Sequence, residues 1–206
     1  MKKFKIHTPC NFQTVFFGNY IIPNCIKPMW TYVKNPIEWL VLDVNKDENK
    51  ALLLSKYALD WELFAISCEN TQVSWESSYL RKWLNDGFYN ACFDAEEHSA
   101  ICPTFITPES GNAKRTLDNI FLLSEKEVEK YFTTEESART YDFMLSPSDG
   151  DKEEPHELSY EPCFWWTRTP GSEPDLVVCV DPYGFFDELE LYSDEVGVRP
   201  AMWVKL

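Results

Sequence analysis

The 206-residue sequence has only seven glycines and three histidines, which is little material for phosphate-binding loops or histidine metal sites. It contains no Gly-x-Ser-x-Gly nucleophile elbow and no His-Glu-x-x-His motif. His98 and Cys102 are four residues apart, but a zinc site takes at least three ligands from the protein. No motif therefore indicates a catalytic centre, although a cysteine–histidine pair brought together by folding stays open.

Long apolar runs are also missing. No segment approaches the roughly 20 apolar residues that cross a bilayer, and the basic stretch at residues 1–7 lacks the apolar continuation of a signal peptide. The seven cysteines form no Cys-x-x-Cys pair, and their odd number favours reduced thiols over a disulfide framework. We expect a cytoplasmic protein that does not contact membranes.

Positive charge is scarce, because 19 lysines and arginines face 34 aspartates and glutamates for a net charge of −15. This balance argues against binding to nucleic acid or to anionic lipid, both of which are bound by basic surfaces. A hydrophobic content of 44% and an aromatic content of 16% argue against disorder. The eight tryptophans and ten tyrosines indicate either a core of large rings or an exposed surface for sugars or protein partners.

The N-terminal part of the sequence predicts strands. Residues 12–22 form a β-prone stretch that ends at Pro23, and residues 37–44 and 51–55 form the two strands of a hairpin. Both hairpin strands are nearly continuous in apolar residues, which predicts a central position in a sheet.

The middle of the sequence predicts helices. Ser74 is expected to cap a helix over residues 75–85 that ends at Asp86-Gly87. Asp94 and Glu97 form a second capping signal, and Ser124 and Glu127 form a capping box after a strand at residues 120–123.

The C-terminal part predicts an acidic loop over residues 142–162 and then four strands separated by turns, one of them at Gly197. The strands are expected at residues 163–167, 176–180, 185–191 and 198–204. The order of strands, helices and strands predicts an α+β fold with antiparallel sheets and two to four helices in the middle of the chain. We expect one domain over residues 1–206, with a core from about residue 12 onward.

Two arginines lie within aromatic segments near the C-terminus. Trp165 and Trp166 precede Arg168, and Arg199 occurs in the last predicted strand before Trp203. Arginines in such segments usually pack their stems on rings and bond to carboxylates or carbonyls. We therefore assign a structural role to Trp165, Trp166, Arg168 and Arg199.

The predicted strand from Phe185 has one polar face with aromatic side chains at both ends. Alternation places Phe186, Glu188, Glu190 and Tyr192 on this face. Such a face is typical of a glycan-binding or protein-binding surface and equally of a solvent-exposed strand. The candidate ligand-binding residues are Tyr183, Phe186, Asp187, Glu188, Glu190, Tyr192 and Asp194.

Five short motifs occur along the chain. They are Pro-Ile-Glu-Trp-Leu-Val-Leu-Asp at 36–43, Ser-Lys-Tyr-Ala-Leu-Asp at 55–60, a Trp-Glu…Leu-Arg-Lys-Trp-Leu-Asn helix at 75–85, Trp-Trp-Thr-Arg-Thr-Pro-Gly at 165–171 and Gly-Val-Arg-Pro-Ala at 197–201. With these motifs the chain resembles a bacterial family of domains of unknown function.

The last two motifs also resemble those of the C-type-lectin-like fold, as in the variable proteins of diversity-generating retroelements and the formylglycine-generating enzymes. The resemblance implies a ligand face built by the last strands and their loops, and it implies no reaction. The paired reactive cysteines of the formylglycine-generating enzymes have no clear counterpart here. Glu173-Pro174-Asp175 is similar to a tripeptide of calcium-dependent lectins. We expect no cofactor, with a bound calcium ion as the alternative.

The leading hypothesis is a non-enzymatic module that binds a carbohydrate or a protein surface through the C-terminal strand face. One alternative is an enzyme of the formylglycine-generating type, or other cysteine or metal chemistry in the same fold. Another is a structural or assembly domain whose aromatic side chains all lie in the core.

Overall fold

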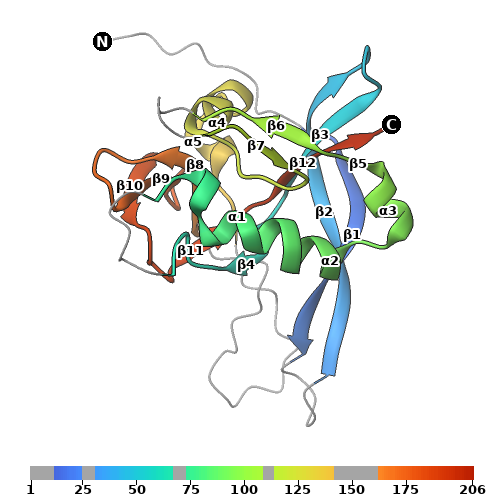
Figure 1. Ribbon diagram of the computed structural model, residues 1–206, viewed down its shortest axis with the longest axis horizontal. Coiled ribbons are helices and arrows are strands. Elements are labelled where there is room, and N and C mark those ends of the chain that lie inside the picture. The colour runs from blue at the N-terminus through green and yellow to red at the C-terminus, as the bar shows by residue number, and fades with distance from the viewer. Residues whose placement is uncertain (1–11, 25–30, 67–72, 109–113, 142–161) are drawn as a thin grey trace.

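The computed structural model describes residues 12–24, 31–66, 73–108, 114–141 and 162–206 (Figure 1). The chain forms curled, mainly antiparallel sheets, and helices in the middle of the sequence join them. This mixed architecture confirms the expected combination of antiparallel sheets and central helices. The predicted acidic loop lies almost entirely outside the described residues. Within the described parts, no helix combines the length and apolar character needed to span a membrane.

The first sheet contains the predicted hairpin. Its strand order is β1-β2-β3-β12-β5, and β3 lies at the centre with five of its six residues buried. The predicted end at Pro23 is wrong, because Pro23 lies inside β1 and pairs with Tyr32. A proline is tolerated there because β1 is an edge strand, on which a missing N–H need cost no ladder bond. The strands are β1 (Thr14–Asn24), β2 (Thr31–Asn45), β3 (Lys50–Ser55), β5 (Ile101–Cys102) and β12 (Ala201–Lys205).

The second sheet has the order β10-β9-β8-β11-β4. All its pairings are antiparallel except that between β11 and β8. The predicted strand at residues 176–180 is confirmed with both its ends, and those at 163–167 and 185–191 are confirmed with shifted ends. The strands are β4 (Asp60–Trp61), β8 (Phe164–Pro170), β9 (Leu176–Val180), β10 (Phe186–Glu190) and β11 (Val196–Val198).

The last predicted strand, residues 198–204, is in fact divided between the two sheets. β11 pairs in the second sheet, and β12 pairs in the first after the link formed by Arg199 and Pro200. Gly197, predicted as a turn, lies within β11, and a Cβ at this position would be 2.6 Å from Cβ of Ala58. Glycine therefore allows a close approach of strand and loop there.

The first helical region differs from its prediction at both ends. Ser74 precedes only the single turn η1 (Trp75–Ser77), and Ser78 caps the helix that follows. That helix continues through Asp86-Gly87, because Leu84, Phe88 and Cys92 extend its buried stripe at intervals of four. Its segments are α1 (Tyr79–Trp83), η2 (Leu84–Phe88) and α2 (Tyr89–Cys92).

Three shorter helices follow, and both predicted capping boxes are confirmed. Asp94 and Glu97 cap α3 (Ala95–Ala100), and Ser124 and Glu127 cap α4 (Glu125–Tyr131). The strand predicted at residues 120–123 is wrong, because only Phe121 pairs, in a single bridge with Ala201. The apolar run reflects the burial of all four side chains in the core and not pairing in a sheet. The remaining elements are α5 (Glu135–Ala138) and the hairpin of β6 (Thr104–Ile106) and β7 (Thr116–Asp118).

One hydrophobic core joins both sheets and the helices. Figure 1 shows the two sheets on opposite sides of the molecule, with the run from α1 to α2 extending from one to the other. Trp39 of the first sheet and Trp165 and Trp166 of the second are completely buried in this core. The large rings of the chain are thus used mainly to fill the space between the layers.

Candidate functional site

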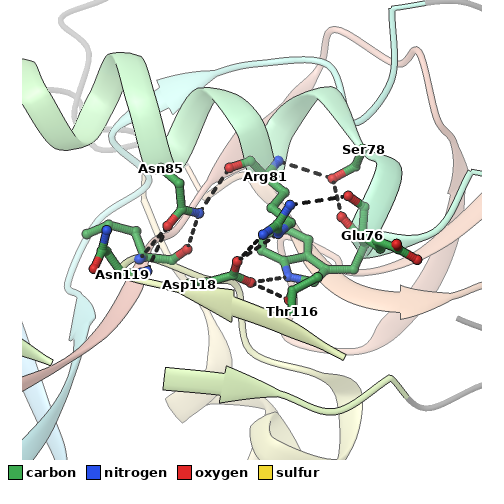
Figure 2. Close-up of polar contacts among 9 residues, drawn as sticks. Glu76, Ser78, Arg81, Asn85, Thr116, Asp118 and Asn119 are labelled. Atoms are coloured by element: carbon green, nitrogen blue, oxygen red, sulfur yellow. Dashed lines mark hydrogen bonds and ion pairs between the residues drawn. The ribbon is translucent and has the colours of Figure 1, made fainter. Parts of the chain in front are cut away.

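A polar network fastens the start of the helical run to β7 (Figure 2). The Asp118 carboxylate, which is 1% exposed, accepts hydrogen bonds from Trp75 Nε1 at 2.8 Å, Thr116 Oγ1 at 2.7 Å and Arg81 Nε at 2.7 Å. Arg81 Nη2 also lies 2.6 Å from Oδ1 of Asp118. A buried carboxylate is costly unless it is paired and hydrogen-bonded, and both conditions are met here.

Asn85 continues this attachment one turn later. Its Nδ2 donates to the carbonyls of Arg81 at 3.0 Å and Ile120 at 2.7 Å, and its Oδ1 accepts from the Asn119 N–H at 2.7 Å. Trp75, Arg81 and Asn85 all belong to the Trp-Glu…Leu-Arg-Lys-Trp-Leu-Asn motif. Their contacts hold the helical run in place, so this motif is explained by the fold.

The predicted ligand-binding residues lie on and beside the edge strand β10. We call the exposed residues Tyr183, Phe185, Phe186, Asp187, Glu190, Tyr192 and Asp194 the β10 surface. Tyr183 is 64% exposed, Tyr192 41% and Phe186 37%. Phe185 was not among the predicted ligand residues, and its exposure is evident only from the structure.

The register of β10 agrees only partly with the predicted face. Phe186, Glu188 and Glu190 pair with Val180, Val178 and Leu176 of β9 and therefore share one side of the sheet. Asp187 is on the other side. Tyr192 lies beyond the end of the strand, in a turn after the buried Leu191.

Glu188 has a local structural contact. Its two carboxylate oxygens accept hydrogen bonds from Ser172, from the N–H at 2.9 Å and from the hydroxyl at 2.6 Å. Glu188 is also only partly exposed. These bonds attach the loop between β8 and β9 to β10, so we leave Glu188 out of the β10 surface. The neighbouring Glu173 and Asp175 are exposed in the same loop.

The backbone edge of β10 is blunted. The Asp181 N–H donates to the Phe185 carbonyl, and the Leu191 N–H donates to the Asp175 carbonyl. Because bonded pairs alternate along an antiparallel ladder, the odd-numbered residues of β10 bond to β9. The backbone groups of Phe186, Glu188 and Glu190 therefore point away from the sheet. The Glu188 N–H donates to Oδ1 of Asp187, and the Glu190 carbonyl accepts from Ser193. Such capping and acidic side chains disfavour the addition of another strand.

The turn before β10 is held firmly. Oδ1 of Asp181 accepts from the N–H groups of Tyr183 and Phe185, each at 2.8 Å, and Arg139 Nε donates to the Tyr183 carbonyl at 3.1 Å. Gly184 has a φ of +93°, and a Cβ there would lie 1.8 Å from the Glu135 carbonyl oxygen of α5. The exposed rings of the turn therefore extend from a fixed backbone.

The residues predicted to be structural lie in the core. Trp165 Nε1 donates to the Ala138 carbonyl at 3.1 Å, and Trp166 Nε1 donates to the Glu62 carbonyl at 3.0 Å. Arg168 forms an ion pair with Glu127 of α4, while its Nε is buried without a hydrogen-bond partner among the described residues. These contacts link β8 to α4, α5 and the segment after β4.

Arg199 is completely buried between two rings. Its guanidinium carbon lies 4.9 Å from the Trp165 ring and 5.4 Å from the Phe132 ring. Nε donates to the Ser55 carbonyl at 2.8 Å, and the other two nitrogens are 3.4–3.5 Å from the carbonyls of Lys56 and Ala138. Burial lowers the pKa of Arg199 to about 9, because the charged form is desolvated and no carboxylate of the described residues bonds to it.

A second cluster of ionisable groups was not found from the sequence. Asp60 accepts a hydrogen bond from the Tyr20 hydroxyl, and Glu62 accepts one from Tyr79. Burial, and then the nearby Asp60 charge, raises the pKa of Glu62. Burial and the same carboxylate also raise the pKa of Tyr20. The spacing Asp-x-Glu was visible in the sequence, but nothing there indicated the two tyrosines.

The thiols in the described part of the chain are reduced and mostly buried. Burial raises the pKa of Cys92 and of Cys179 to about 12, which keeps both in the protonated, weakly nucleophilic form. His98 stacks on Tyr89 at 4.2 Å, and Cys102 lies apart from its helix in β5. The described residues contain no group of three metal-ligating side chains placed to hold an ion.

Comparison with known proteins gives a family but no activity. The model of the family described as a domain of unknown function (DUF6273) matches residues 48–206, so the chain belongs to this family. The match includes four of the five motifs and begins after the Pro-Ile-Glu-Trp strand. Neither the search of curated proteins nor the search of solved structures found a match.

Proposed function

We propose that this domain is a non-enzymatic binding module that recognises its ligand through the β10 surface. The observation that carries the proposal is the exposure of four aromatic side chains along one edge strand and its two turns. Most of the other large rings among the described residues lie in the core or pack against it. Single exposed rings are common on proteins, but a group of them marks contact sites more often than chance.

The firmness of the backbone supports recognition by side chains. The Asp181 bonds, the Arg139 bond and the contact of Gly184 with α5 hold the turn before any ligand arrives. A preorganised surface loses less conformational entropy on binding. Because the β10 edge is blunted, contacts would come from rings and carboxylates and not from added strand pairing.

Charge favours a protein ligand over a carbohydrate. Within the described chain, no lysine, arginine or histidine forms an ion pair with Asp187, Glu190 or Asp194. Unpaired carboxylates around exposed rings complement a partner that presents arginines or lysines beside apolar groups. A carbohydrate would use the same rings for stacking and the same carboxylates as hydrogen-bond acceptors, and it is the second outcome of the test below.

The finer fold assignment, C-type-lectin-like, is part of this proposal. It is supported by the place of the β10 surface, which is built by the last strands and their loops, as the resemblance implies. The cytoplasmic location and the absence of a cofactor also belong to the proposal. Calcium near Glu173 and Asp175 would alter it, since a bound cation would offer a sugar-binding centre beside β10.

The test is a parallel screen with a glycan array and with immobilised protein as bait for a lysate, using wild type, Tyr183→Ala and Phe186→Ala. Phe16→Ala is the matched control, because Phe16 is 69% exposed on β1 of the other sheet. The proposal predicts at least one ligand that is weakened by both β10-surface substitutions and unchanged by the control. The proposal is contradicted if every ligand found is weakened equally by all three substitutions, or is weakened by none of them.

A further inference from the structure

The β6–β7 hairpin has one buried and one exposed face. Ile106, Thr116 and Asp118 face inward, where Asp118 belongs to the network of Figure 2. On the opposite face, Phe105 of β6 lies directly across from Leu117 of β7. Phe105 is 57% exposed and Leu117 54%, so two large apolar side chains form an exposed cross-strand pair.

Basic side chains flank this pair. The Arg115 guanidinium carbon lies 4.0 Å from the centre of the Phe105 ring, and Lys114 is the preceding residue. Arg115 forms no ion pair with a carboxylate of the described residues, whereas Lys114 lies 3.9 Å from Glu76. The hairpin therefore presents an arginine stacked on an aromatic ring, which is a common anchor of protein interfaces.

We propose that the hairpin face docks onto the β10 surface of a second copy of this chain. The inference rests on the proposed function and names its partner. The hairpin matches the partner described above, because it presents Arg115 and Lys114 beside two apolar side chains. The β10 surface presents carboxylates beside exposed rings, so the two surfaces are complementary. The contact would bury Phe105 and Leu117 against the rings of the β10 surface and give Glu190 the cation that it lacks in the single chain.

The two surfaces belong to different elements, so the contact is head-to-tail. Each copy uses its hairpin toward one neighbour and its β10 surface toward the other, which generates a chain or a closed ring of copies. The net charge of −15 on every copy opposes association over long distances. At physiological salt, charges farther apart than about 8 Å are largely screened, so the local complementarity decides.

The test uses two variants, each with one surface altered. Phe105→Ala/Arg115→Glu changes only the hairpin, and Phe186→Ala/Glu190→Lys changes only the β10 surface; all four side chains are exposed, so folding should persist and is checked by circular dichroism. Sedimentation velocity of each variant, of wild type and of an equimolar mixture is measured at about 0.15 M salt from micromolar to millimolar concentration.

We expect wild type to sediment faster as concentration rises, each variant to remain monomeric, and the mixture to form a dimer that does not grow further. The mixture has one intact surface of each kind, which allows a single contact. A wild type that stays monomeric throughout, or variants that associate as wild type does, would overturn the inference. If wild type is monomeric while Phe186→Ala still loses a ligand found in the screen, the proposed function stands and only the second copy is wrong.

Discussion

The Tyr20 hydroxyl donates a hydrogen bond to the Asp60 carboxylate across two different sheets. Tyr20 lies on β1, an edge of the first sheet, and Asp60 lies on β4, an edge of the second. The Tyr20 ring also packs 5.9 Å from Phe88 in the helical run. This hydrogen bond therefore connects the edge strands of the two sheets beside the helical run.

Substitution Tyr20→Phe tests how much this hydrogen bond contributes to the free energy of unfolding. The ring contact with Phe88 is kept, and only the hydroxyl is lost. Since hydrogen bonds to charged groups contribute about 1.5–3 kcal/mol, and Asp60 keeps its bond from the Trp61 N–H, we expect a loss of about 1.5 kcal/mol. Urea unfolding measures the difference. A change below about 0.5 kcal/mol, the size of an ordinary surface substitution, would mean that the bond does not join the sheets.

Substitution Glu62→Gln should change the pH dependence of stability. Burial and Asp60 raise the pKa of Glu62 in the folded protein, so the folded state holds this proton at a pH where the unfolded chain has lost it. Stability therefore falls as pH rises from the unfolded pKa, about 4.3, through the raised folded value. The glutamine side chain of the variant remains neutral and keeps an acceptor for Tyr79.

The comparison is made between unfolding free energies at about pH 4, just below the unfolded pKa, and at about pH 7, well above it. Relative to wild type, the Glu62→Gln protein should gain stability on going from the lower to the higher pH. Glu96→Gln, at an exposed position of α3, serves as the control and should leave the pH profile of wild type unchanged. An identical profile for Glu62→Gln and wild type would refute the raised pKa.

Local sequence patterns predicted those elements whose signals lie within a few neighbouring residues. The two capping boxes and strand β9 were found because their signals lie within a few residues. The continuation of the helix through Gly87 was missed because buried Phe88 and Cys92 outweigh a glycine turn signal. The division of residues 198–204 between two sheets depends on partners that are distant in the sequence, such as Leu54 for Ala201.

Substitution Asp118→Ala should destabilise the protein strongly. It would leave Trp75 Nε1, Thr116 and the Arg81 guanidinium without their common acceptor. Removal of one member of a buried pair typically costs about 3–5 kcal/mol. We expect a loss of about 3 kcal/mol in urea unfolding, because Arg81 is partly exposed and regains some hydration.

The matched control for Asp118→Ala is Lys82→Ala, at an exposed position beside Arg81, which should change stability by less than about 0.5 kcal/mol. The double variant Arg81→Ala/Asp118→Ala completes a thermodynamic cycle. It should be less destabilised than the sum of its single variants, since no unpaired charge remains. Strict additivity would show that the two side chains are not coupled.

Two glycine substitutions should have opposite effects. Gly184→Ala places a Cβ at positive φ and 1.8 Å from the Glu135 carbonyl oxygen, and the backbone strain alone costs about 1–3 kcal/mol. Gly87→Ala lies in the helical run with only ordinary contact to Trp83, and it should stabilise by about 0.5–1 kcal/mol. Differential scanning calorimetry distinguishes the two, and equal transition temperatures would contradict the geometry.

The candidate site was only partly visible in the sequence. Alternation correctly grouped Phe186 with Glu190, because a strand has a fixed period. It could not show that Ser172 donates hydrogen bonds to Glu188, that Tyr192 lies beyond the strand or that Phe185 is exposed. These features depend on how the loops on either side of β9 and β10 fold back, which a local pattern does not encode.

The most direct measurement of the central claim is the dissociation constant of the best ligand from the screen, determined by titration calorimetry. Wild type, Tyr183→Ala, Phe186→Ala and the control Phe16→Ala are compared at the same salt concentration. If the β10 surface is the recognition surface, the first two substitutions weaken binding at least about tenfold, a cost of about 1.4 kcal/mol, and the control leaves it unchanged. Equal dissociation constants for all four proteins would show that the ligand binds elsewhere.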